Sequence, residues 1–245
     1  MRAVRPAAVA FGFLTRLPLR AAEVGERDLG RSVAYFPVAG LALGALVGAA
    51  AWAVRGHLAP AVQAAMLVAL LAWLTGGLHL DGLADVFDGL SGGHRDPARA
   101  LAIMRDARIG AHGAAALCLL LLAKAAALVP LLERSDGWAL IAFPVAARWA
   151  VVPLVVLFPY ARPEGLGKAF HENARAVQVA VATLLAAPVA ISMGVRAAAP
   201  IAAALAAALL FALVVQRRLG GLTGDVYGAC IELSELAFLV AAGVQ

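Results

Sequence analysis

Long apolar stretches separated by short polar segments dominate the sequence. A helix needs roughly 20 apolar residues to cross a bilayer. Stretches that reach or approach this length cover residues 33–54, 58–80, 112–132, 138–159, 176–195, 198–215 and 226–245. Glycine and proline occur in the polar segments between them, as is typical of loops. The pattern predicts an all-α protein, a polytopic transmembrane bundle of about seven spanning helices.

The first apolar stretch, residues 6–19, is too short to span a bilayer. We expect it to form a short interfacial or re-entrant helix that ends at Pro18. Two runs of small residues stand out in the later stretches: the spacing Gly40, Gly44, Gly48 and the alanine-rich segment 198–209. Small residues let helix backbones approach, so both runs predict close helix packing.

Composition supports a membrane protein. Of the 245 residues, 63% are hydrophobic and 14% are charged, and the mean hydropathy is +0.89. A soluble domain carries roughly 25% charged residues, so we expect one integral-membrane domain over residues 1–245, with the lipid bilayer as its surroundings. The net charge of +5 fits basic cytoplasmic loops and, without interleaved aromatic residues, excludes a nucleic-acid partner. Cys118 and Cys230 lie in apolar stretches and indicate neither a disulfide nor a zinc site.

Lysine and arginine define an orientation. If the basic segment 1–31 is cytoplasmic or interfacial, fifteen basic residues fall in cytoplasmic segments and three in the opposite loops. This positive-inside bias predicts a cytoplasmic N-terminus. It also places the polar segments 81–111 and 216–225 on the cytoplasmic side, where they are candidate active-site loops.

An acidic stretch follows the second apolar window. Asp81, Asp85 and Asp88 come shortly after His79, at helical spacings of four and three residues, and so share one helix face. Three like charges on one face repel unless a cation lies among them, and a divalent metal with oxygen ligands is the usual solution. The alternative is a solvated acidic cap at a helix end.

A cationic segment follows at residues 103–113. In a helix, Arg105, Arg108 and His112 would form one face. The forked donors of arginine suit phosphate oxygens. The alternative is an ordinary cytoplasmic arginine cluster.

Two cations lie within predicted spanning helices, Lys124 and Arg148. A lysine in this position costs about 3 kcal/mol on insertion scales. Each should therefore face a polar cavity or a carboxylate. A structural ion pair inside the membrane is the competing explanation.

The last polar loop is rich in glycine and opens a helix. Its Thr223 and Gly224 offer backbone N–H groups to an anion. Asp225, Glu232 and Glu235 then form a second acidic face that enters the final apolar stretch. Together, two acidic faces, a glycine loop and a set of cations resemble a phosphoryl-transfer centre, in which Mg²⁺ and cations neutralise a pyrophosphate.

These motifs, in this order, resemble those of one family: cobalamin synthase, the adenosylcobinamide-GDP ribazoletransferase of cobamide assembly. The matching segments run from near the N-terminus to the last helix: Phe13-Leu14-Thr15-Arg16-Leu17-Pro18, Phe36-Pro37-Val38-Ala39-Gly40, the stretch from Gly76 to Asp85 with Asp88-Gly89, the stretch from Met104 to Gly110, Lys124, Arg148, Glu164-Gly165-Leu166-Gly167, and the stretch from Gly220 to Asp225 with Glu232 and Glu235.

The resemblance implies a reaction and a location. The 3′-hydroxyl of α-ribazole, or of its 5′-phosphate, attacks the cobinamide-side phosphate of adenosylcobinamide-GDP, and GMP leaves. Such Mg²⁺-dependent phosphoalcohol transferases work at the cytoplasmic (inner) membrane of prokaryotes. The oligomeric state stays open.

Residue roles follow as hypotheses from the resemblance and the chemistry together. The metal ligands would be Asp81, Asp85, Asp88, Asp225 and Glu232. The groups that bind substrate phosphates would be Arg105, Arg108, Lys124, Arg148, Thr223 and Gly224. The acceptor of the nucleophile's proton would be Asp106 or His79.

Two other functions stay open at this point. An integral-membrane CDP-alcohol phosphotransferase also uses an acidic helix that opens with Asp-Gly, but its motif continues Ala-Arg where this chain has Asp85-Val86. An ion-coupled transporter would carry polar groups near the bilayer midplane and inverted repeats. Here most carboxylates lie at predicted helix ends, and no repeat is evident.

Overall fold

The structure, a computed structural model, describes residues 4–17 and 24–244. Within these ranges it is all-α, with one isolated bridge between Tyr160 and Leu222 and no strand. The helices are α1 (Val4–Leu14), α2 (Glu26–Ser32), η1 (Val33–Tyr35), α3 (Phe36–Ala53), α4 (Pro60–Thr75), α5 (Leu78–Gly92), α6 (Pro97–Ile103), α7 (Ala111–Glu133), α8 (Gly137–Leu157), α9 (Leu166–Asn173), α10 (Ala176–Met193), η2 (Gly194–Ala197), α11 (Ala198–Leu219) and α12 (Gly224–Gly243).

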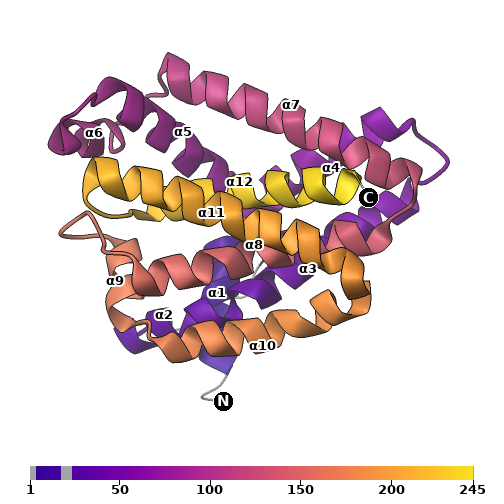
Figure 1. Cartoon of the computed structure of the whole chain (residues 1–245), viewed down its shortest axis with the longest axis horizontal. Coiled ribbons are helices and arrows are strands. Elements are labelled where there is room, and N and C mark those ends of the chain that lie inside the picture. Colours follow the sequence, from indigo (N-terminus) through magenta and orange to yellow (C-terminus); the bar gives the residue numbers. More distant parts are fainter. Residues whose placement is uncertain (1–3, 18–23, 245) are drawn as a thin grey trace.

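The long helices form one bundle around α8 and α12. These two helices have most of their apolar windows buried, whereas α7 and the α10–α11 stretch turn large leucine and isoleucine side chains outward. Helix α8 packs against α3, α10, α11 and α12, and α12 packs in turn against α5, α7 and α11 (Figure 1). Apolar side chains both inside and outside are what a bilayer-embedded bundle requires. The predicted polytopic helix bundle is confirmed.

Small residues set the closest helix contacts, as the sequence predicted. A Cβ atom at Gly40 would stand 2.5 Å from the carbonyl oxygen of Pro144 in α8, and one at Gly44 would overlap the backbone of Ile141. On α11, Ala204 and Ala208 are fully buried, and their carbonyl oxygens accept side-chain hydrogen bonds from α12. Such contacts replace the hydrophobic effect, which supplies no helix–helix attraction in lipid.

Among residues 4–17 and 24–244, five helical stretches are long and apolar enough to cross a membrane, and the bent pair α4–α5 makes a sixth if it counts as one span. One of the five, Ala176–Leu219, contains 44 residues. A straight helix of that length would extend about 66 Å, twice the ~30 Å hydrocarbon core. The chain instead turns back at η2, between α10 and α11 (Figure 1). The predicted windows 176–195 and 198–215 therefore fall on separate helices.

The second window ends differently from the prediction. Helix α4 stops at Thr75 instead of continuing to residue 80, and α5 leaves it at an angle of 92°. Gly76 and Gly77 make this corner, with φ angles of +67° and +73° that side chains rarely adopt. Segment 81–111 is therefore no simple loop, because α5 and α6 occupy most of it.

Helix α1 also differs from the prediction, since it ends at Leu14. The hydroxyl of Thr15 bonds to the carbonyl of Phe11 and accepts the N–H of Leu17, which terminates the helix. Pro18, the predicted end, lies outside the described residues.

The two ends of the bundle differ in chemistry. At one end, Arg55, Arg134 and Arg196 line adjoining hollows formed by the α3–α4, α7–α8 and α10–α11 turns. At the other end, α5, α6 and α9 gather beside the start of α12 (Figure 1). All the candidate loops of the sequence analysis meet at this second end.

Candidate active site

Helices α5 and α12 cross at close range, and two glycines make the crossing possible. A Cβ atom at Gly82 would stand 2.7 Å from the carbonyl oxygen of Asp225, and one at Gly228 would stand 3.1 Å from Cα of His79. No other residue type fits there without moving a helix backbone. The crossing brings the first acidic face, on α5, beside the second, on α12.

Asp81 and Asp85 line a cavity of about 630 Å³ between α5 and the segment that follows α6. The opposite wall carries Arg105, Asp106 and Arg108. We call this the arginine cavity. Residues of the acidic and the cationic sequence motifs thus line one cavity.

The wall that carries these arginines has a different backbone from the one predicted. Helix α6 ends at Ile103 and α7 begins at Ala111, so Arg105 and Arg108 lie in a connecting turn. The prediction of a helical cationic face over 103–113 was wrong. Asp96-Pro97 starts α6 with the Asp96 carboxylate accepting the N–H groups of Ala98 and Arg99, which makes α6 a separate, short helix.

Both carboxylate oxygens of Asp106 accept hydrogen bonds from Arg108. Its Oδ1 accepts the backbone N–H and the Nε–H of Arg108, and its Oδ2 accepts Nη2–H at 2.7 Å. These bonds lower the pKa of Asp106 to about 2. A carboxylate of such low basicity is a weak proton acceptor.

Asp88 lies on the acidic face but turns to α7. Its oxygens accept the backbone N–H groups of Gly110, at 2.6 Å, and Gly113, at 2.8 Å. A side chain at either glycine would collide with the carboxylate. Asp88 therefore satisfies the free N–H groups at the start of a spanning helix.

A second cavity, of about 300 Å³, lies on the other side of α5. We call it the aromatic cavity. Its apolar wall includes Phe13, Phe36 and Phe170, and its polar groups come from His79, Asp81, Tyr160, Arg162, Asp225 and Tyr227. Leu78 and Asp81 line both cavities, so the two spaces meet at the start of α5.

The loop before α9 positions the polar groups of the aromatic cavity. Ala161 N–H donates to the carbonyl of Leu222 at 2.8 Å, which holds this loop against the glycine turn before α12. Arg162 then reaches Asp225, with 2.7 Å between Nη2 and Oδ2. Tyr160 lines the same cavity, and desolvation raises the pKa of its hydroxyl. Sequence reasoning missed Arg162 and Tyr160, although the neighbouring Glu164-Gly165-Leu166-Gly167 motif pointed to this loop.

The side chain of Thr223 caps the start of α12. Its hydroxyl oxygen accepts the N–H of Val226 and its hydroxyl donates to Asp225 Oδ2 at 3.2 Å. This is a helix N-cap, and it orients the Asp225 carboxylate towards the cavity. Gly224 lines the aromatic cavity.

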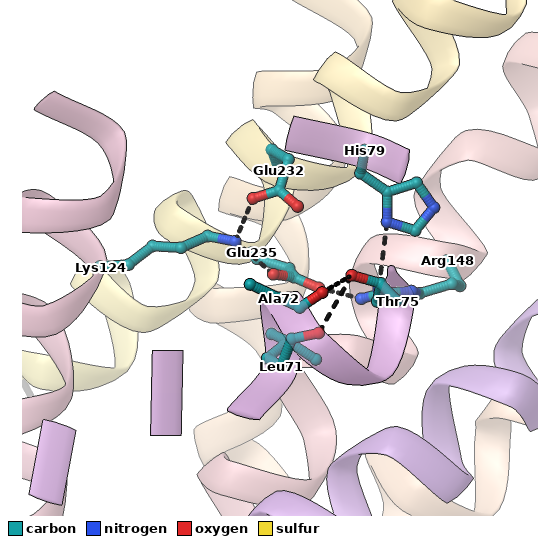
Figure 2. Close-up of polar contacts among 8 residues, drawn as sticks. All are labelled: Leu71, Ala72, Thr75, His79, Lys124, Arg148, Glu232 and Glu235. Atoms are coloured by element: carbon teal, nitrogen blue, oxygen red, sulfur yellow. Dashed lines mark hydrogen bonds and ion pairs between the residues drawn. The ribbon is translucent and has the colours of Figure 1, made fainter. Parts of the chain in front are cut away.

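The intramembrane charges form one buried cluster that contains Glu232 and Glu235 of the second acidic face (Figure 2). Lys124 of α7 donates to Glu232 at 2.5 Å and to Glu235, and Arg148 of α8 donates to Glu235. Arg148 Nη2 also lies 3.4 Å from Nδ1 of His79. The expectation that each cation faces a carboxylate is confirmed. Two cations and two carboxylates balance, as burial in a low-dielectric interior requires.

Several residues that were predicted to bind metal or substrate lie in this cluster. Glu232 does not join Asp225, because its carboxylate pairs with Lys124 and is 4% exposed. Lys124 and Arg148 likewise lie among carboxylates and line neither of the two cavities. His79, at the edge of the cluster, is the one member that also borders the aromatic cavity.

The remaining carboxylates suit a metal ion that substrate phosphates also bind, rather than one held by protein ligands alone. Among the described residues, no three His, Cys, Asp or Glu side chains are arranged to hold a metal ion. Mg²⁺, however, is commonly held by one or two carboxylates together with substrate phosphates. Asp81 and Asp85, one helical turn apart and both lining the arginine cavity, fit that pattern.

Comparisons with known proteins bear on the whole chain. Residues 6–243 match the family described as cobalamin-5-phosphate synthase. Three relatives carry the name adenosylcobinamide-GDP ribazoletransferase. That of Thiobacillus denitrificans is 44% identical over 97% of this chain and 94% of its own. Those of Stutzerimonas stutzeri and Desulfitobacterium hafniense are each 41% identical, over 98% and 99% of this chain and 98% of their own. No solved structure matches the chain significantly.

Proposed function

The chain belongs to the cobalamin-5-phosphate synthase family, and we propose on that premise that it joins adenosylcobinamide-GDP to α-ribazole with release of GMP. This is the last assembly step of the cobamide nucleotide loop. The acceptor is α-ribazole or its 5′-phosphate. The enzyme is a phosphoalcohol transferase embedded in the membrane.

The observation that carries this proposal is the meeting of two cavities at Asp81. A transfer between two large substrates needs one site for each, with the reacting atoms adjacent. The arginine cavity offers Arg105 and Arg108 to a diphosphate, because guanidinium groups donate in the geometry that phosphate oxygens accept. The aromatic cavity opens on the opposite side of the same residue.

The bonds that change are two. The 3′ oxygen of α-ribazole forms a bond to the cobinamide-side phosphorus, and the bond from that phosphorus to the bridging oxygen breaks. The electron pair of the broken bond leaves with GMP. The proton of the attacking hydroxyl passes to a base, and Asp225 is the carboxylate that the wall of the aromatic cavity offers beside Asp81.

The arginines stabilise charge during this transfer. Negative charge develops on the equatorial phosphate oxygens and on the leaving GMP. Arg105 is free to approach them, whereas Arg108 would exchange its bonds with Asp106 for bonds to phosphate.

We also propose that Mg²⁺ takes part. Asp81 and Asp85 would hold it jointly with diphosphate oxygens, and Asp225 lies beyond Gly82 across the helix crossing. The ion supplies neutralisation of the diphosphate when bound. Asp88 and Glu232 stand outside this proposal, since α7 and Lys124 occupy their oxygens.

The distribution of lysines and arginines supports a location and an orientation for the protein. The described helices support a multi-pass membrane protein, and we propose the cytoplasmic membrane of a prokaryote. Segments 81–111, 160–175 and 216–225 at the candidate-site end carry nine lysines and arginines, against Arg55, Arg134 and Arg196 at the other end, which favours a cytoplasmic site. Both adenosylcobinamide-GDP and GMP would then exchange with the cytosol.

The test uses purified protein in detergent with Mg²⁺, adenosylcobinamide-GDP and α-ribazole. We expect a new corrinoid and an equal amount of GMP, and we expect both to depend on Mg²⁺. A parallel reaction with a CDP-alcohol and a diacylglycerol-type acceptor measures CMP release. CMP without GMP would replace the proposed function with that of a CDP-alcohol phosphotransferase.

A further inference from the structure

The aromatic cavity holds polar groups that the protein leaves without partners. Within the described residues, His79 Nε2, Arg162 Nε and the Tyr227 hydroxyl are buried and accept or donate no hydrogen bond. All three residues line this one cavity. Buried polar groups are nearly always hydrogen-bonded, so three such groups around one space indicate a ligand that supplies the missing bonds.

The contact with Arg148 determines what His79 presents to the cavity. A guanidinium group only donates, so Nδ1 of His79, 3.4 Å from Arg148 Nη2, must carry its lone pair there. The proton of the neutral ring is then on Nε2, which points away from Arg148 (Figure 2). His79 therefore offers a hydrogen-bond donor.

The opposite wall is apolar and aromatic. The ring centroids of Phe13 and Phe170 are 4.8 Å apart, and Phe36 lies 5.9 Å from Phe170 at a steep angle. Val151 and Val155 of α8 continue this wall. Such a surface accepts a flat, uncharged ring system by stacking and edge contacts.

Size and charge select between the two substrates. A corrin macrocycle far exceeds a cavity of about 300 Å³, and a diphosphate suits the arginine cavity better. A nucleoside with a planar aromatic base fits both the volume and the division into an apolar and a polar end.

We propose that the aromatic cavity binds α-ribazole, with its benzimidazole base against Phe13, Phe36 and Phe170. The ribose then lies at the polar end, where His79 Nε2–H and the Tyr227 hydroxyl bond to its oxygens. This places its hydroxyls beside Asp81, the residue shared with the arginine cavity. The assignment rests on the proposed function and adds the place of the acceptor.

The test separates the two Michaelis constants. In Phe170→Leu, the KM for α-ribazole should rise roughly tenfold or more, because base–aromatic contacts of this kind contribute on that scale. The KM for adenosylcobinamide-GDP should stay within about twofold. The matched control is Phe211→Leu, which removes an aromatic ring that stacks on Phe87 outside the cavity and should change neither constant.

A second experiment measures the binding of α-ribazole to wild-type protein in the absence of adenosylcobinamide-GDP. Equilibrium dialysis of wild-type protein with α-ribazole alone should show saturable binding, and free benzimidazole should compete where ribose 5-phosphate does not. A Phe170→Leu effect on the donor KM, or competition only by ribose 5-phosphate, would overturn the assignment. Failure of the proposed function would look different: wild-type protein would release no GMP from adenosylcobinamide-GDP.

Discussion

The buried cluster of Lys124, Arg148, Glu232 and Glu235 allows a sharp prediction about charge balance. In Lys124→Met, the carboxylate of Glu232 loses its 2.5 Å partner while it stays buried. In Lys124→Met/Glu232→Gln, one charge of each sign is removed, and the contact between Arg148 and Glu235 remains. The two variants differ only in whether the interior stays neutral.

The magnitude follows from burial. The side chains of Lys124 and Glu232 are 4% and 6% exposed, so water screens them little. Two unit charges about 4 Å apart attract by about 4 kcal/mol at an effective dielectric constant near 20. Removal of one partner of a buried pair costs about 3–5 kcal/mol, whereas removal of both is often near neutral. We therefore expect Lys124→Met to lose about 3–5 kcal/mol of stability and the double variant to regain most of it.

Thermal unfolding in one fixed detergent measures both variants. A loss of this size corresponds to a fall of roughly 6–20 °C in Tm for a chain of this length. The control is Lys168→Met, which breaks a surface pair with Glu172 at 3.5 Å whose side chains are 37% and 56% exposed. That change should cost no more than about 0.5 kcal/mol.

Two results would refute this account. Equal stability of Lys124→Met and wild type would mean that the pair contributes nothing. A double variant that is as unstable as Lys124→Met would mean that packing, not charge, is lost. Activity adds a separate outcome: if the stable double variant lost GMP release, Lys124 would contact substrate, as first considered from the sequence.

Three further predictions concern the active site. Gly82→Ala should lower the free energy of unfolding by about 1–3 kcal/mol and remove most of the GMP release, because the added Cβ atom would stand 2.7 Å from a carbonyl oxygen of α12. The control is Gly137→Ala, since Gly137 has open space around it. Equal melting temperatures of the two variants would exclude a close crossing of α5 and α12. Asp88→Ala should lose about 1–2 kcal/mol, because two N–H groups of α7 lose their acceptor, and unchanged melting would contradict the capping role. Asp106 has a pKa of about 2, below its unfolded value, so its bonds to Arg108 stabilise the fold at neutral pH and weaken only as the pH falls towards about 2. Asp106→Asn should therefore keep the shape of the pH–rate profile between about pH 6 and 9, and the loss of a limb there would restore Asp106 as the base.

Periodicity and composition were enough to predict the helices of the bundle. A spanning helix needs a long apolar run, and its backbone groups must be hydrogen-bonded within the helix. The glycine and alanine spacings of α3 and α11 also indicated correctly where backbones approach. The corner at Gly76-Gly77 was missed, since apolar residues continue through it and hydropathy does not register a backbone angle.

The active site was predicted in part. Spacing alone placed Asp81 and Asp85 on one face, and that is a property of the helix. The partners of Asp88 and Glu232 depend on which helices lie opposite, and that information is tertiary. In the sequence, nothing distinguishes Arg162 from the other cytoplasmic arginines. Its contact with Asp225 depends on the hydrogen bond between Ala161 and Leu222, which joins its loop to the glycine turn.

The buried cluster also constrains how the protein is made. Glu232 and Glu235 follow Lys124 by 108 and 111 residues, and Glu235 follows Arg148 by 87. At about 5–20 residues per second, a ribosome needs roughly 5–20 s to reach them. During that interval two cations stand in nascent transmembrane helices without their acids, and the arrival of α12 neutralises both at once. Helix α12, whose first turns line the aromatic cavity, is thus also the helix whose insertion brings acids to both buried cations.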